Sequence, residues 1–183
     1  MQVVHISFIG GSVGDWRITA AQTLRGASLP TAAFLTRKEG FEQPTAPPAW
    51  HLRGFTSNLR YTTASEAAEL AGRQAPLGRS DSRLAALIPI RKSEAWWALG
   101  QDERRAIYEE RSRHTSIGME YLPRIARKLH HSRDLGEPFD FLTWFEFGEA
   151  DAGAFDELVG RLRSTEEWQY VDREVDLRLA RVV

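Results

Sequence analysis

Cysteine is absent from this sequence of 183 residues. Its absence excludes disulfide bonds, zinc sites built on thiolates, iron–sulfur clusters and a haem whose iron is ligated by a thiolate. A metal would have to be bound by histidine, carboxylate, tyrosine or methionine side chains, and methionine itself occurs only twice.

An excess of either charge is also lacking, since 24 basic residues face 25 acidic ones and the net charge is −1. A chain without a strong overall field is a poor candidate for binding nucleic acid or an anionic membrane surface. No long apolar run follows the first methionine, which predicts neither a signal peptide nor a membrane span, and the expected location is the cytoplasm. The remaining composition, 42% hydrophobic and 27% charged, is ordinary for a globular protein.

The first half of the chain is rich in glycine and proline, and its elements are weakly marked. Thr63 and Glu66 have the spacing of a capping box, which predicts the start of a helix. The expected elements are a strand over 3–9, an irregular stretch to about 47 with one short helix near 17–25, a strand over 49–61, a helix to 71, and a buried strand over 84–90.

The second half shows clearer periodicity. Asp151 is placed to cap a helix in which apolar residues recur at helical spacing from Phe155 to Leu162. The expected elements are a charged helix over 102–113, alternating strands over 119–130 and 138–148, the capped helix, and a last alternating strand over 170–182.

The order strand–strand–helix–strand therefore occurs twice. Two such units form two antiparallel sheets with helices outside them, which can close into a single α+β barrel. A single irregular α+β domain is the alternative that the pattern leaves open.

Arg127 is the first residue that suggests a site. The alternation over 119–130 places it on an apolar face with Tyr121, Ile125 and Leu129, where a guanidinium is costly unless it meets an anion or a ligand. On spacing alone, an arginine paired with a carboxylate in the core or at a subunit contact is the simpler interpretation.

Histidines and tryptophans supply further candidates. His114 is expected in a loop, where a lone histidine is usually structural, and His130 and His131 are expected to be solvated beside a polar turn. Trp96 and Trp97 point in different directions because they are neighbours, so one could line a flat ligand while the other packs against a partner. Two core tryptophans would fit the sequence equally well.

Several runs stand out together: Ile88–Ser93, Trp96-Trp97, His114–Gly118, Tyr121–Arg127, Phe141–Phe147 and Thr165–Trp168. With these runs, the chain resembles the chlorite dismutases over about residues 83–180, and the first 80 residues resemble the short, dimeric branch of that family. The most specific feature is a histidine after the charged helix with an arginine 13 positions later (127 − 114). The resemblance implies two ferredoxin-like repeats in one barrel with outer helices, an abbreviated N-terminal half over 1–91 and a haem-binding half over 92–183.

The resemblance also assigns roles to individual residues. It implies a ferric haem b, a hydrogen-bonding carboxylate behind its ligand, and a distal arginine that retains an oxychlorine fragment. The residues are His114 as the axial iron ligand, Glu167 as its hydrogen-bond partner with Glu166 as the rival, Lys92 at a haem propionate, Trp96 and Met119 along the haem pocket, Trp97 toward a subunit contact, and Arg127 as the distal arginine.

The implied activity is the conversion of chlorite, a small anion, to chloride and O₂ by oxygen-atom transfer to the haem and rebound O–O bond formation, in a homodimer. Three alternatives remain: a coproheme decarboxylase, whose relatives generally lack an arginine at the position of Arg127, an unassigned haem peroxidase, and a haem-binding oligomer without chlorite turnover.

Overall fold

The computed structural model describes residues 3–41, 43–44, 46–56 and 60–182. In this part of the chain the strands are β1 (His5–Gly11), β2 (Trp16–Arg25), β3 (Phe34–Glu39), β4 (Trp50–Phe55), β5 (Leu84–Lys92), β6 (Ala126–His131), β7 (Phe141–Phe147) and β8 (Val171–Arg181). They close into an antiparallel barrel in the order β1-β3-β2-β8-β5-β7-β6-β4. The predicted α+β barrel is confirmed.

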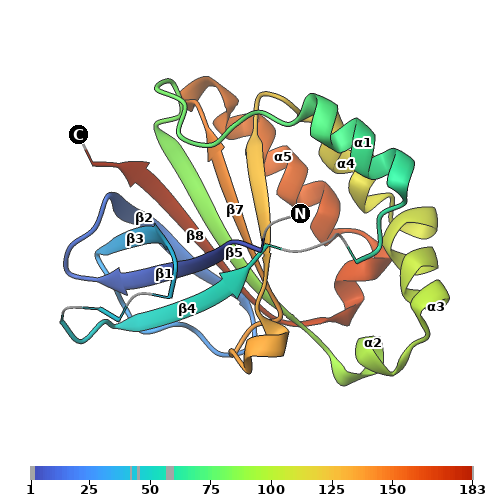
Figure 1. The fold of residues 1–183 in the computed structure, drawn as a ribbon, viewed down its shortest axis with the longest axis horizontal. Helices are drawn as coiled ribbons and strands as arrows, with labels where there is room; N and C mark the ends of the chain where they lie inside the picture. The colour runs from blue at the N-terminus through green and yellow to red at the C-terminus, as the bar shows by residue number, and fades with distance from the viewer. Residues whose placement is uncertain (1–2, 42, 45, 57–59, 183) are drawn as a thin grey trace.

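The helices cover mainly one side of this barrel (Figure 1). They are α1 (Ala64–Arg73), α2 (Glu94–Ala98), α3 (Gln101–Arg105), the π-helix η1 (Ala106–Arg111), α4 (His114–Glu120), α5 (Ala152–Arg163), and the 3-10 turns η2 (Arg133–Leu135), η3 (Glu149–Asp151) and η4 (Glu166–Tyr170). Strands β8, β5, β7 and β6 form the sheet on which α5 packs, while β1 to β4 form the other wall. Strand β5, which our boundary placed in the N-terminal half, pairs on both sides with strands of the C-terminal half.

The predicted helix near 17–25 is wrong, because these residues form β2. Its alanines, glutamine and leucine favour a helix locally, but the segment pairs with β8 along almost its whole length, with two register shifts. Tertiary pairing overrides local preference here. Strand β3 was missed, and the strand expected over 49–61 ends at Phe55, with residues 57–59 outside the described ones.

The charged helix predicted over 102–113 is confirmed, since α3 continues without a break into the π-helix η1. Two further predictions fail near the candidate site. His114 is the first residue of α4 rather than part of a loop. The strand over 119–130 begins only at Ala126, so Tyr121 and Ile125 share no strand face with Arg127. A short apolar segment does not by itself separate helical from strand periodicity.

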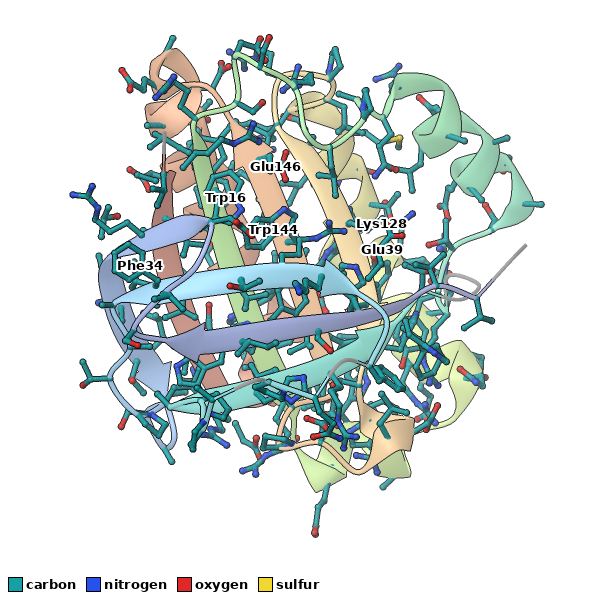
Figure 2. The ribbon with its side chains drawn as sticks, turned by 60° about the vertical axis from the view of Figure 1, so that its left-hand side comes forward. Trp16, Phe34, Glu39, Lys128, Trp144 and Glu146 are labelled. Atoms are coloured by element: carbon teal, nitrogen blue, oxygen red, sulfur yellow. The ribbon has the colours of Figure 1, made fainter. Side chains whose placement is uncertain are left out.

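Two buried clusters lie on opposite faces of the C-terminal sheet. Along β7, Leu142 and Trp144 point into the barrel, whereas Phe141 and Phe145 point outward to the helices. Inside the barrel, Trp144 meets Trp16 edge to face, with ring centroids 5.4 Å apart. Figure 2 labels both residues. Both faces are apolar, so hydrophobicity does not distinguish them.

Several polar groups are buried by this arrangement. His130 and His131, predicted to be solvated, are buried. On β8, Glu174 and Asp176 lie beneath α5, where Arg163 bonds both carboxylates at 2.7 and 2.8 Å. Asp151 precedes α5, although its side chain makes no capping hydrogen bond.

Among the described residues, no helix has both the length and the apolar character needed to cross a bilayer.

Candidate functional site

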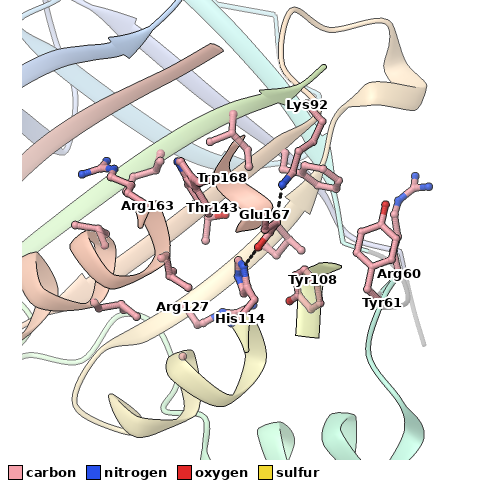
Figure 3. A pocket seen from close by; sticks show the side chains of 18 of the residues that line it. Arg60, Tyr61, Lys92, Tyr108, His114, Arg127, Thr143, Arg163, Glu167 and Trp168 are labelled. Carbon is pink, nitrogen blue, oxygen red and sulfur yellow. Dashed lines mark hydrogen bonds and ion pairs between the residues drawn. The ribbon is translucent and has the colours of Figure 1, made fainter. Parts of the chain in front are cut away.

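A cavity opens between the outer face of the C-terminal sheet and the helices α4, α5 and η4 (Figure 3). It is partly open to solvent, and together with its open mouth it contains about 1050 Å³ of space between atoms. Most of its wall is apolar, including Ile88, Ile90, Leu129, Phe141, Phe145, Leu158, Val159 and Leu162. Its polar lining includes His114, Arg127, Lys92, Glu167, His131 and Arg163.

The polar centre of the cavity is a chain of three residues, in which a half-buried histidine meets a buried glutamate and a buried lysine. His114 Nδ1 lies 2.6 Å from Glu167 Oε2, and Lys92 Nζ lies 2.6 Å from Glu167 Oε1. The backbone N–H of Glu167 donates to the hydroxyl of Ser112 at 2.9 Å, which holds η4 in place. One carboxylate thus joins the helix α4 to the end of strand β5.

The charge state of Glu167 follows from this environment. Burial alone would raise the pKa of its carboxyl, but Lys92 and His114 outweigh burial and lower the pKa to about 2. An ionised carboxylate only accepts hydrogen bonds, so Nδ1 of His114 is the donor. The Nε2 lone pair of such an imidazole is then available to a metal.

Two aromatic rings orient the imidazole of His114. Tyr108 stacks on it with a centroid distance of 4.5 Å and an interplanar angle of 20°, and Trp168 lies 6.3 Å away at 23°. Burial raises the pKa of Tyr108 to about 12, so its phenol stays protonated. Neither ring was assigned to the site from the sequence, although Tyr108 is an aromatic residue within a charged segment.

Arg127 lies on β6 and lines the same cavity. Within the described part of the chain, no carboxylate forms an ion pair with its guanidinium. Gly118 on α4 leaves it room, since a Cβ there would lie only 3.3 Å from Arg127 Nη1. The amide of Gln74 donates to the backbone carbonyl of Arg127. The described residues therefore offer no carboxylate for the simpler interpretation, in which Arg127 forms an ion pair in the core.

Three further residues that the sequence assigned to the haem pocket lie as follows. Lys92, expected at a haem propionate, directs its ammonium to Glu167 and lies 4.4 Å from the ring centroid of Trp96. Trp96 is fully buried behind Lys92, its indole N–H donates to Tyr61 at 3.3 Å, and it is not among the cavity-lining residues. Met119 does not line the cavity either.

Of the two candidate glutamates, Glu167 contacts the histidine, whereas Glu166 pairs with Arg111 at 3.2 Å. Trp97, expected toward a subunit contact, stacks on Phe141 at 6.2 Å and lies beside the guanidinium groups of Arg104 and Arg133.

The donor set fits a haem better than a bare metal ion. No group of three or more His, Asp or Glu ligands gathers within the described ranges, so a free ion would lack ligands. An iron porphyrin needs only one axial protein ligand, and His114 offers Nε2 from a cavity whose walls suit a flat apolar ring.

Comparisons with known proteins identify the family. The family model described as chlorite dismutase matches residues 37–183. The curated chlorite dismutase of Ideonella dechloratans is 33% identical over 121 residues, which are 65% of this chain and 40% of that protein. The match therefore spans less than half the length of this relative.

Solved structures extend the similarity over almost the whole chain. A crystal structure of dimeric chlorite dismutases from Nitrobacter winogradskyi is 51% identical, covers 96% of this chain and 99% of its own, and superposes with a TM-score of 0.89. The chlorite dismutase of Candidatus Nitrospira defluvii in complex with imidazole is 21% identical over 97% of this chain and 91% of its own, with a TM-score of 0.65. At that identity it supports the fold alone.

Proposed function

The chain belongs to the chlorite dismutase family, and we propose on this basis that it binds haem b through His114 and converts chlorite to chloride and O₂. The observation that carries the proposal is one cavity in which a carboxylate-bound histidine and an arginine without an ion-pair partner among the described residues meet apolar walls.

The proximal side of the site is built by His114, Glu167 and Lys92. Glu167 holds the imidazole in one tautomer and orientation, and its negative charge makes Nε2 a stronger donor to iron. Lys92 compensates the buried charge of Glu167, because an unpaired carboxylate at this depth would be strongly destabilising.

Haem b, when bound, supplies a redox-active iron with a coordination position open to a small anion. Arg127 attracts the oxyanion into the cavity and holds it by charge-assisted hydrogen bonds from a planar fork of donors. The apolar walls exclude water, which strengthens this attraction. The net conversion of ClO₂⁻ to Cl⁻ and O₂ balances without a reductant or a proton, so no external electron donor is needed.

The first experiment is an optical titration of the purified protein with haem, followed by oxygen measurement after chlorite is added. The His114→Ala variant should lose haem affinity by more than the 10–100-fold that removal of a ligand's hydrogen-bond partner typically costs. His5→Ala, the same change at an exposed histidine outside the cavity, is the control. An unchanged ferric spectrum in His114→Ala would remove the proposed ligand, and haem uptake without oxygen release would leave only haem binding.

A homodimer is the assembly that we propose, since the solved relative that is 51% identical is described as dimeric. Sedimentation equilibrium of the haem-loaded protein tests this: a mass near 20.7 kDa, that of one chain, would contradict it.

A further inference from the structure

The start of helix α4 is unusual for the helix that carries His114. The residue before it, Arg113, has φ 54° and ψ 36°, a left-handed conformation that is disfavoured for a residue with a side chain. No side chain at this N-cap position accepts a hydrogen bond from the helix. The first N–H groups of a helix have no partner inside it, so an acceptor must come from elsewhere.

Glu109 provides that acceptor. Its Oε2 accepts from the backbone N–H of Thr115 at 2.6 Å, and its Oε1 accepts from the backbone N–H of Ser116 at 3.2 Å and from the Ser116 hydroxyl. The residue is 8% exposed, so these bonds are shielded from water. A single carboxylate from the preceding helix therefore caps α4 immediately after His114.

The π-helix η1 explains how Glu109 reaches this position. A π-helical turn contains an extra residue and is often found at functional sites. The wider turn directs two adjacent side chains of η1 to α4: Tyr108 stacks on the ring of His114, and Glu109 caps the backbone beyond it. Ser112, just after η1, holds the backbone of Glu167. One short segment thus contacts the imidazole of His114, the first turn of α4 and the backbone of Glu167, the residue that accepts from the imidazole.

We propose that Glu109 is a positioning residue for His114, an inference that rests on the proposed role of His114 as the haem ligand. By holding two N–H groups in the first turn, Glu109 sets the rotation of α4 about its axis, and hence the direction in which the imidazole enters the cavity. It also places a negative charge at the positive end of the helix, next to the ligand.

A purely structural cap would behave differently. Its loss would lower the stability of the protein but leave the imidazole and its bond to iron unchanged in the folded molecules. A positioning residue, in contrast, alters the environment of His114 in the folded protein, with or without haem. Measurements on the imidazole itself separate these two roles.

The test compares Glu109→Gln with Glu110→Gln, the same change at the exposed neighbouring residue. Without haem, the Nδ1–H resonance of His114 should shift in Glu109→Gln, and the amide hydrogens of Thr115 and Ser116 should exchange faster with solvent. With haem, the affinity should fall about tenfold. The iron–imidazole stretching band of the reduced protein should broaden or move. Glu110→Gln should match the wild type in all four measurements.

If Glu109→Gln folds poorly, Ser116→Ala removes only the hydroxyl contact and should shift the same signals in the same direction by less. Faster amide exchange together with an unchanged His114 resonance, haem affinity and stretching band would overturn the inference and leave a structural cap. A wild-type protein that takes up no haem would instead contradict the proposed function, and the His114 resonance would still decide whether Glu109 positions the ring.

Discussion

The two faces of strand β7 carry alternate residues of one short sequence but form different environments. Leu142 and Trp144 point into the barrel, where aromatic and aliphatic side chains fill the space. Phe141, Thr143 and Phe145 point outward, where a cavity remains between the sheet and the helices. The difference is in how completely the opposite layer fills the space, not in the hydrophobicity of the strand.

Polar groups sharpen this contrast. Inside the barrel, the buried Glu146 accepts from the indole N–H of Trp144 at 2.8 Å and from the backbone of Gly78 at 2.6 Å. Outside, Arg127 faces the cavity with no ion-pair partner among the described residues. Satisfied polar groups indicate structure, whereas polar groups that converge on open space indicate a binding site.

Adjacent histidines show the same division. His130 meets Phe8 edge to face at 5.5 Å, a residue of the barrel cluster, while His131 lines the cavity. Burial lowers the pKa of His130 to about 3. Burial, and then Arg60, lowers the pKa of His131 to about 4, and Arg60 Nε lies 3.2 Å from His131 Nδ1.

The largest expected effect belongs to the filled face. Trp144→Ala should lower the free energy of unfolding by about 3–5 kcal/mol, because it opens a cavity and removes a bond to Glu146. The matched change on the other face is Phe145→Ala. It should lower the free energy of unfolding by less than Trp144→Ala does but reduce haem affinity by more, because Phe145 already borders the open cavity. Urea unfolding and haem titration of both variants test this. Equal losses in both assays would contradict the division into two faces.

The next effect concerns acid stability. His130 is buried unprotonated, so below a pH of about 6.5 the unfolded chain binds a proton that the folded chain does not, and stability is lost as the pH falls toward 3. Between pH 7 and 4.5 this histidine should account for roughly 2–3 kcal/mol of lost stability. Urea unfolding of wild type and His130→Phe at both values measures it. The wild type should lose more stability than the variant, and parallel losses would refute the assignment.

A smaller loss is expected from the carboxylate of the open face. Glu167→Gln should weaken haem binding by about 10–100-fold and raise the reduction potential of the iron, because a neutral amide is a poorer acceptor for the imidazole N–H. Glu166→Gln, at the glutamate that pairs with Arg111, is the matched control. Haem titration and potentiometry decide between them. If only Glu166→Gln changed the haem affinity and the potential, Glu166 rather than Glu167 would be the partner of the imidazole.

The smallest effect is expected at Arg127. Arg127→Ala should keep the fold and the haem but bind cyanide and fluoride about tenfold more weakly, which corresponds to the loss of one charge-assisted hydrogen bond of about 1.5 kcal/mol. It should also release more hypochlorite during chlorite turnover, measured with a chlorination trap. The anion affinity and hypochlorite release of Arg127→Lys should lie between those of the wild type and Arg127→Ala. Lysine keeps the positive charge but lacks the planar arrangement of several N–H donors. Lower thermal stability with unchanged anion affinity would return Arg127 to a structural role.

Much of the fold could be predicted where the local pattern and the tertiary contacts agree. The alternation of β8 and the amphipathic face of α5 come from residues that are close in sequence, and they persist in the barrel. The candidate site was predicted in part: the sequence and its resemblance to known proteins singled out His114, Glu167 and Arg127, which the fold brings to one cavity.

The sequence by itself determined which segments have a buried face and which chemical groups are available, because both depend on residue type and short spacing. Only the tertiary structure decided that 16–25 pairs with β8 instead of forming a helix. It also decided that Lys92 meets Glu167 and that Glu109 caps the helix of His114. Pairings such as those of β2 with β8 and Lys92 with Glu167 join groups far apart along the chain. Their energies depend on the distances that the closed barrel and its helices impose, which no local pattern encodes.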